Sequence, residues 1–143
     1  MLGCAAGCVA GRTTDDDRGD GREQISTVTS ELTQTFGAGS LIIPLDTQFQ
    51  DAGALRAYGL VYQLLASNIP VQWAVDPAKV AGGNDITIAA PAVVHDRETG
   101  TNIARPVHYR GGPFLIAAAD APAALPIVDA WLAANTTVVH SLI

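Results

Sequence analysis

GSLIIPLDTQFQDAGALRAYGLVYQLLASNIPVQWAVD (residues 39–76) is the segment whose pattern decides the predicted fold. Its first part, residues 39–46, is a continuous apolar run, which is typical of a buried strand in a parallel sheet. Residues 69–76 form a second such run, and both runs end in an aspartate. With a helix between them they predict one βαβ unit, whose crossover is right-handed almost without exception.

The connection between these runs, residues 51–68, is predicted to be that helix. Asp51 is the predicted N-cap, and Asn68 is the predicted stop. The apolar side chains of the segment recur at helical spacing; they are Leu55, Tyr58, Val61, Tyr62 and Leu65.

The second half of the chain repeats this alternation after an interruption. Residues 85–96 and 102–110 are predicted strands, joined through Gly100 as a hairpin. RGGPF (110–114) is then a tight turn, 111–120 a third buried strand, 121–135 a second helix and 136–143 a fourth strand. The predicted fold class is α/β: a partial doubly wound sheet, flavodoxin-like or Rossmann-like and mostly parallel, in the order β-α-β-hairpin-β-α-β. Because the chain stops at the last apolar residue of a buried strand, we expect the domain to be truncated at its C-terminus.

Composition divides the chain into two parts and excludes several partners. Residues 1–38 hold six acidic and three basic residues in a polar stretch whose one aromatic residue is Phe36, so we predict a disordered tether before a domain at 39–143. The net charge of −6 and the pI near 4.7 argue against nucleic-acid binding and against polybasic contact with lipid. No apolar run reaches the 18 residues of a membrane span.

Candidate ligand-binding residues follow the predicted strands. In doubly wound sheets, ligands bind beyond the carboxyl ends of the strands. The residues at or near those ends are Asp46, Thr47, Gln48, Asp76, Lys79 and Asp120. Converging aspartates bind cations, orient a ribose or transfer protons. The alternative is structural: Asp120 is a helix N-cap and Asp76 a turn residue, whereas Asp46 has no evident capping role.

Metal-binding and nucleophilic motifs are both missing from the sequence. His95 and His108 fall on the two hairpin strands and could face each other beside Asp96, but no HxH, HxxxH or CxxC spacing supports a metal site. We therefore expect no metal, no cofactor and half-exposed strand histidines. The domain has no cysteine, no G-x-S-x-G elbow and no glycine-rich phosphate loop. No catalytic residue is assigned, and the pattern favours a protein that is not an enzyme.

The segments SLIIPLD (40–46), YGLVYQLLASNIPVQWAVD (58–76) and GGPFLIAAAD (111–120) together resemble the opening half of the class I glutamine amidotransferase-like group. The resemblance covers 39–143 and implies a flavodoxin-like sheet with a catalytic cysteine on a strand-to-helix elbow. In this chain the elbow reads AADAP, with Asp120 and Ala121 where the cysteine would stand. The resemblance therefore implies a relative without the amidase nucleophile.

The N-terminal MLGC and CAAGC resemble bacterial lipobox sequences, in which small residues precede a cysteine that becomes lipid-modified. The resemblance implies lipidation at Cys4 or Cys8. The basic and apolar regions that precede a lipobox are not in this sequence, which a late start codon or an incomplete sequence would explain. The rival hypothesis is a cytosolic chain with two idle or mutually disulfide-bonded cysteines.

These observations lead to one functional hypothesis and two alternatives. The first is an extracytoplasmic lipoprotein, attached to the cell envelope only through its lipid, whose domain binds a small ligand or a protein partner without catalysis. The second is the N-terminal half of a hydrolase or transferase whose catalytic residues lie beyond Ile143. The third is a nucleotide-binding half-domain that uses Asp76 on a ribose. A secreted or cytoplasmic location is the alternative to the lipid anchor.

Overall fold

The computed structural model describes residues 35–50 and 54–143, which belong to one unit of the chain. Cys4, Cys8, Asp51 and nearly all of the predicted tether lie outside these residues. The elements are β1 (Leu41–Ile43), α1 (Ala54–Ala66), β2 (Gln72–Trp73), β3 (Ile86–Ile88), β4 (Val94–Asp96), β5 (Thr101–Ile103), β6 (Val107–Tyr109), β7 (Phe114–Ile116), α2 (Ala121–Ala134) and β8 (His140–Leu142).

The sheet is antiparallel, so the predicted parallel doubly wound fold is wrong. Six strands form the main sheet in the order β2-β7-β1-β8-β4-β5, and every neighbouring pair is antiparallel. The helices and strands lie within the predicted segments, although the predicted strands 85–96 and 102–110 are each divided into two strands of different sheets. The error lies in which strands are neighbours, because β1 pairs with β7 and β8 rather than with β2.

The two strand-helix-strand units are interleaved rather than placed side by side. β7 lies between β1 and β2, and β1 lies between β7 and β8. Each helix therefore connects two strands that run in the same direction but are separated by an antiparallel strand. This β-α-β-β-α-β order is the split βαβ, or ferredoxin-like, topology. An arm containing β3 to β6 is inserted between β2 and β7.

The inserted arm is a long hairpin whose strands belong to two different sheets. The predicted hairpin is confirmed at its tip, where β4 pairs with β5 around a turn that contains Gly100 with a φ of 71°. β4 also pairs with β8 and so extends the main sheet. Closer to the base of the arm, β3 pairs with β6 as a separate two-stranded ribbon. Pro91 and Pro106 lie between the two paired regions, and proline has no N–H to donate to a ladder.

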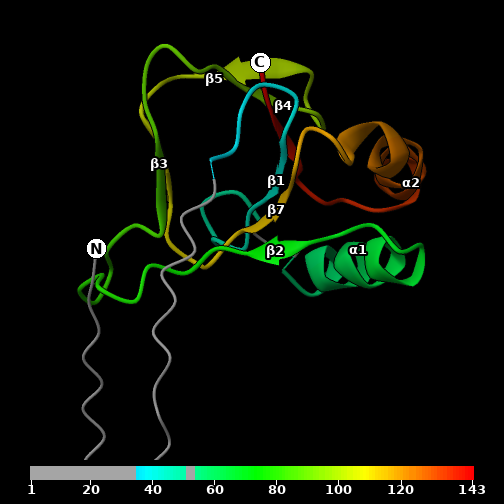
Figure 1. Cartoon of the computed structure of the whole chain (residues 1–143), viewed down its shortest axis with the longest axis horizontal. Helices are drawn as coiled ribbons and strands as arrows, with labels where there is room; N and C mark the ends of the chain where they lie inside the picture. Colours follow the sequence, from blue (N-terminus) through cyan, green and yellow to red (C-terminus); the bar gives the residue numbers. More distant parts are fainter. Residues whose placement is uncertain (1–34, 51–53) are drawn as a thin grey trace, which may run out of the picture. The chain divides into compact units, whose positions relative to one another are not determined.

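The helices and the ribbon lie on opposite sides of the main sheet (Figure 1). One core packs α1 and α2 against one face of the sheet, including Leu41, Ile43 and Ile116. The other core packs the ribbon residues Val107 and Tyr109 against the opposite face; its sheet residues are Ile42, Val94, Leu115 and Leu142.

Helix α1 ends where the sequence predicts but buries a different face. The Asn68 N–H donates to the Leu65 carbonyl and the Ile69 N–H to the Leu64 carbonyl, while Asn68 has a φ of 59°. This is a Schellman motif, and asparagine tolerates its left-handed position. Of the five apolar residues in the predicted pattern only Val61 is buried; the core residues are Ala57, Leu60, Val61 and Leu64. Two apolar stripes both satisfy the helical period, and tertiary packing covers one of them.

Candidate functional site

The predicted ligand-binding residues do not converge on one rim, because the sheet is antiparallel. Asp46 follows β1, whereas Asp120 follows β7, which runs in the opposite direction. The two carboxylates therefore lie at opposite ends of the sheet. Asp120 is at the N-cap position of α2, where its side chain makes no capping hydrogen bond.

Asp46 and Asp76 lie at the same end of the sheet. The carboxylate of each accepts a hydrogen bond from a backbone N–H group. The Arg110 N–H donates to both carboxylate oxygens of Asp46, at 3.0 and 2.9 Å, which fastens the end of β6 to the end of β1. The carboxylate of Asp76 accepts the Ala78 N–H at 2.8 Å, which is the turn role considered from the sequence.

Asp85, which the sequence analysis did not select, is the centre of this network. Its fully buried carboxylate accepts hydrogen bonds from Lys79 Nζ at 2.5 Å, from the Gly112 N–H at 2.8 Å and from the Asp76 N–H at 3.0 Å. Burial raises the pKa of Asp85, but the bonds from Lys79 and the two amides outweigh burial and leave that pKa lowered. Lys79 also donates to the Arg110 carbonyl, so the whole network joins the base of the arm to the sheet.

The glycines of RGGPF have a packing role in this region. Gly112 has a φ of 67°, and a Cβ there would lie 2.5 Å from Nε1 of Trp73. The indole Nε1 instead donates to the Gly112 carbonyl at 2.8 Å. The predicted tight turn is thus the place where the edge strand β2 is fastened to the start of β7.

The two hairpin histidines lie in different sheets and do not face each other. His95 pairs with Asn102 in the β4–β5 hairpin, whereas His108 pairs with Thr87 in the ribbon. Within residues 35–50 and 54–143, no three His, Cys, Asp or Glu side chains gather as a metal site.

A hollow of about 480 Å³ opens on the ribbon side, between the turn after β1, the β4–β5 turn and the start of β8. Its polar lining residues are Gln48, Asp96, Glu98, Thr99, Thr136 and His140. Its apolar lining residues are Phe49, Ile103 and Val138. Of the six sequence candidates, Gln48 alone lines it. The volume is in the range of small-molecule sites.

Gln50 fixes the distance between two walls of this hollow. Its buried amide pairs with the backbone of Val138: Nε2 donates to the carbonyl at 2.8 Å, and Oε1 accepts the N–H at 3.0 Å. The chain between Asp46 and Gln50 is itself closed as a turn, because the Asp46 carbonyl accepts the N–H groups of Phe49 and Gln50. Phe49 is consequently held with its ring edge-to-face against His140, at 4.9 Å between centroids.

His140 and Tyr109 are the buried polar pair beside this hollow. Both residues are fully buried, and Tyr109 Oη lies 2.8 Å from Nδ1 of His140. Nε2 of His140 is buried and has no partner among the described residues. A buried polar group of this kind costs free energy unless a hydrogen-bond partner satisfies it.

The protonation states of the pair follow from burial. Burial lowers the pKa of His140 to about 4, against the smaller opposing effect of the Asp96 carboxylate, so the imidazole is neutral at pH 7. Burial, reinforced by the charge of Asp46, raises the pKa of Tyr109, so its phenol keeps its proton. The phenol donates to Nδ1, since that arrangement gives its proton an acceptor. Nε2 then carries the hydrogen and is a donor without an acceptor.

His140 lies in the predicted strand 136–143 and was not among the predicted site residues. The missed signal is its place in TTVVHSLI (136–143), a predicted buried strand in which a histidine must find a polar partner. Its closeness to Asp96 depends on the pairing of β4 with β8, which local patterns do not reveal.

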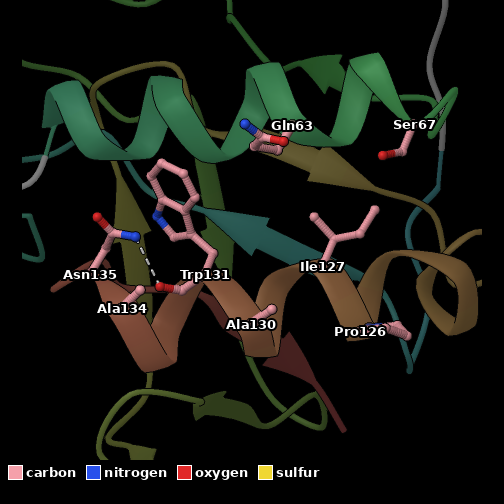
Figure 2. A pocket seen from close by; sticks show the side chains of 8 residues that line it. All are labelled: Gln63, Ser67, Pro126, Ile127, Ala130, Trp131, Ala134 and Asn135. Atoms are coloured by element: carbon pink, nitrogen blue, oxygen red, sulfur yellow. Dashed lines mark hydrogen bonds between the residues drawn. The ribbon is translucent and has the colours of Figure 1, made fainter.

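A second hollow, of about 540 Å³, lies between α1 and α2. Figure 2 shows Trp131 extending from α2 towards α1, with Gln63 and Ser67 on the opposite side. A Cβ on Gly59 would lie 2.7 Å from the Trp131 ring, so this glycine allows the close packing. Trp131 Nε1 donates to Thr137 and Asn135 Nδ2 to the Trp131 carbonyl, so these polar groups already have partners. We assign this hollow to helix packing.

Comparison with known protein families, curated proteins and solved structures finds no match. None of the described helices is long and apolar enough to cross a membrane.

Proposed function

We propose that this chain is a non-catalytic binding domain that holds a small, neutral, hydroxyl-rich ligand in the hollow beside His140. The observation that carries the proposal is a hollow of ligand size whose described lining combines an exposed carboxylate, hydroxyl groups and an aromatic ring, next to the buried His140, whose Nε2 has no partner among the described residues.

The lining selects the ligand class. Glu98 is an acceptor for hydroxyl groups, and the hydroxyl of Thr136 both donates and accepts. The carboxylate of Asp96 already accepts the Glu98 N–H and the Thr99 hydroxyl proton, so it supports the wall of the hollow. Phe49 offers apolar aromatic surface for the C–H groups of such a ligand. The nine described residues that line the hollow include no Lys or Arg, which argues against phosphate or another anion.

The state of the imidazole supports binding rather than proton transfer. A histidine with a pKa of about 4 is a weak base at neutral pH, and its Nδ1 already accepts the Tyr109 hydroxyl. It is therefore a fixed, uncharged part of the wall beside the proposed ligand.

Thermal-shift measurements with a panel of neutral monosaccharides and polyols test the proposal. We expect members of the panel to raise the melting temperature, because a ligand that binds only the folded state stabilises it. The bound compound should also shift the Nε2–H resonance of His140 in a ¹H–¹⁵N spectrum.

Glu98→Gln should weaken this response, because it replaces an exposed carboxylate of the lining with an amide. Asp120→Asn is the matched control, since it makes the same chemical change at the other end of the sheet. A panel without effect on the wild type, or an equal response from both variants, would contradict the proposal.

The cellular location is a separate proposal, supported by the lipobox-like sequence. We propose that Cys4 or Cys8 anchors the domain to the cell envelope through a lipid. Metabolic labelling with a fatty-acid probe should mark the wild type in a bacterial host. Labelling that persists when both cysteines are replaced by serine would refute it.

A further inference from the structure

Helix α1 carries an apolar stripe that the described part of the chain leaves uncovered. Its members are highly exposed: Leu55 (85%), Tyr58 (49%), Tyr62 (69%) and Leu65 (53%). At 100° per residue, the stripe spans roughly 80° and lies about 130° from the face that α1 buries in the core. An amphipathic helix of a monomer normally has one such face.

The stripe continues across the end of the sheet to the edge strand β2. The rings of Tyr58 and Phe114 are 5.6 Å apart, and those of Phe114 and Trp73 are 6.2 Å apart. Trp73 is 64% exposed, and its bond to Gly112 holds the indole in place. Weighted by their exposed fractions, and with 150–250 Å² for a whole aromatic side chain, these residues present roughly 600 Å² of largely apolar surface, against the roughly 800 Å² per partner of a stable interface.

The spacing of the stripe fits another helix. The intervals between its residues are three, four and three, which is the a-d-a-d pattern of a helix that packs along a second helix. Such packing brings the two axes within about 20° of each other.

The order of side chains identifies that helix as a second copy of α1. The stripe reads Leu, Tyr, Tyr, Leu, and both the residues and the intervals are the same in either direction. In a two-fold contact, residue i of one copy meets residue j of the other and the reverse. An antiparallel pair centred at Leu60 places Leu55 against Leu65 of the second copy, and Tyr58 against Tyr62.

The charge on α1 agrees with contact between identical surfaces. Its one charged residue, Arg56, lies about 140° from the centre of the stripe. The seam therefore brings no like charges together, although the whole chain carries a net charge of −6.

From this geometry we infer that the chain forms a two-fold dimer through antiparallel packing of its α1 helices, with Trp73 at the rim. Ligand binding in the hollow beside His140 does not depend on it.

Sedimentation equilibrium of the full chain tests the dimer. We expect twice the monomer mass, and Tyr62→Glu should raise the dissociation constant about 100-fold or more because it places a carboxylate in the middle of the seam. Gln63→Glu adds the same charge on the same helix but outside the stripe, so it should leave the dimer intact. Both sites are exposed, so circular dichroism should show folded protein in each case. A monomeric wild type, or equal behaviour of the two variants, overturns the inference.

Cysteine cross-linking tests the direction of packing in a Cys4→Ser, Cys8→Ser background. Leu55→Cys combined with Leu65→Cys should give a covalent dimer on oxidation, whereas each single substitution should not. In the antiparallel pair the two copies of residue 55 are separated by about 15 Å along the axis, beyond the roughly 7 Å limit for a disulfide. Efficient cross-linking by Leu55→Cys alone would indicate parallel packing and overturn the inferred arrangement.

Discussion

On one face of the six-stranded sheet, α1 and α2 enclose a core of aliphatic side chains; on the other, the ribbon encloses Tyr109 and His140 with the apolar residues. In the hollow on the helix face, Trp131 and Asn135 have hydrogen-bond partners; the hollow on the ribbon face lies beside His140, whose Nε2 has none among the described residues. The inserted arm therefore does more than cover the apolar face of the sheet. It brings the Tyr109 hydroxyl to within 2.8 Å of Nδ1 of the buried His140.

The largest expected effect concerns the helix face. Leu60→Ala removes a fully buried side chain of α1 and should lower the free energy of unfolding by about 4 kcal/mol. Urea unfolding at pH 7 and at pH 5 should give the same loss, because no titratable group belongs to this core cluster. Gln63→Ala, an exposed change on the same helix, should alter stability by less than about 0.5 kcal/mol. If the loss in free energy of unfolding caused by Leu60→Ala depended strongly on pH, the helix face would also contain a titrating group, and the proposed difference between the two faces would be wrong.

The pH dependence of stability should come from the ribbon face. The unfolded chain takes up a proton on His140 near pH 6.5, whereas the folded chain resists it until about pH 4. The unfolded state therefore binds more protons in this window, and the free energy of unfolding should fall by about 3 kcal/mol as the pH is lowered through it. Asp85 contributes little there, because its lowered pKa moves its own loss of stability below 3.8.

Chemical unfolding between pH 7 and pH 4 measures this slope. Tyr109→Phe combined with His140→Phe should flatten it, and replacing both partners together avoids leaving either one unsatisfied. If the double variant kept the wild-type slope, the titrating group would lie elsewhere.

The smallest effect concerns the attachment of the ribbon to the sheet. Asp46→Asn should reduce stability by about 1 kcal/mol, because it removes the charge from an acceptor that holds the Arg110 N–H with both oxygens. Hydrogen exchange should accelerate at Arg110 and in β6, while α1 and α2 keep their protection. Asp120→Asn, whose carboxylate makes no capping bond, should leave exchange unchanged.

The positions of the elements could be predicted from the sequence because they depend on local patterns. The helical period, the stop at Asn68 and the turn at Gly100 all act within a few residues. The direction of the strands could not be predicted from the sequence, since it depends on pairing with strands far along the chain. β1 is covered by helices on one face and by the ribbon on the other, so its residues are all buried. An antiparallel strand in this position has the same continuous apolar run as a strand of a parallel sheet.

The candidate site was less predictable for the same reason. Asp46 and Asp76 are at the ends of strands, as expected, but their carboxylates hold backbone N–H groups. The hollow is lined by the turn after β1, the tip of the arm and the segment at the start of β8. These three segments are far apart in the sequence. The one sequence signal for the hollow was His140, a histidine within a predicted buried strand.

The interleaved strand order has a consequence for how the chain acquires its structure. β1 pairs with β7 and β8, whose residues lie more than 70 positions later, with Ile42 opposite both Leu115 and His140. Pairings so distant in sequence slow folding, because a long loop must close before any contact compensates for it. During synthesis, β1 leaves the ribosome long before either neighbour exists. Its apolar residues remain without sheet partners until synthesis has passed β7.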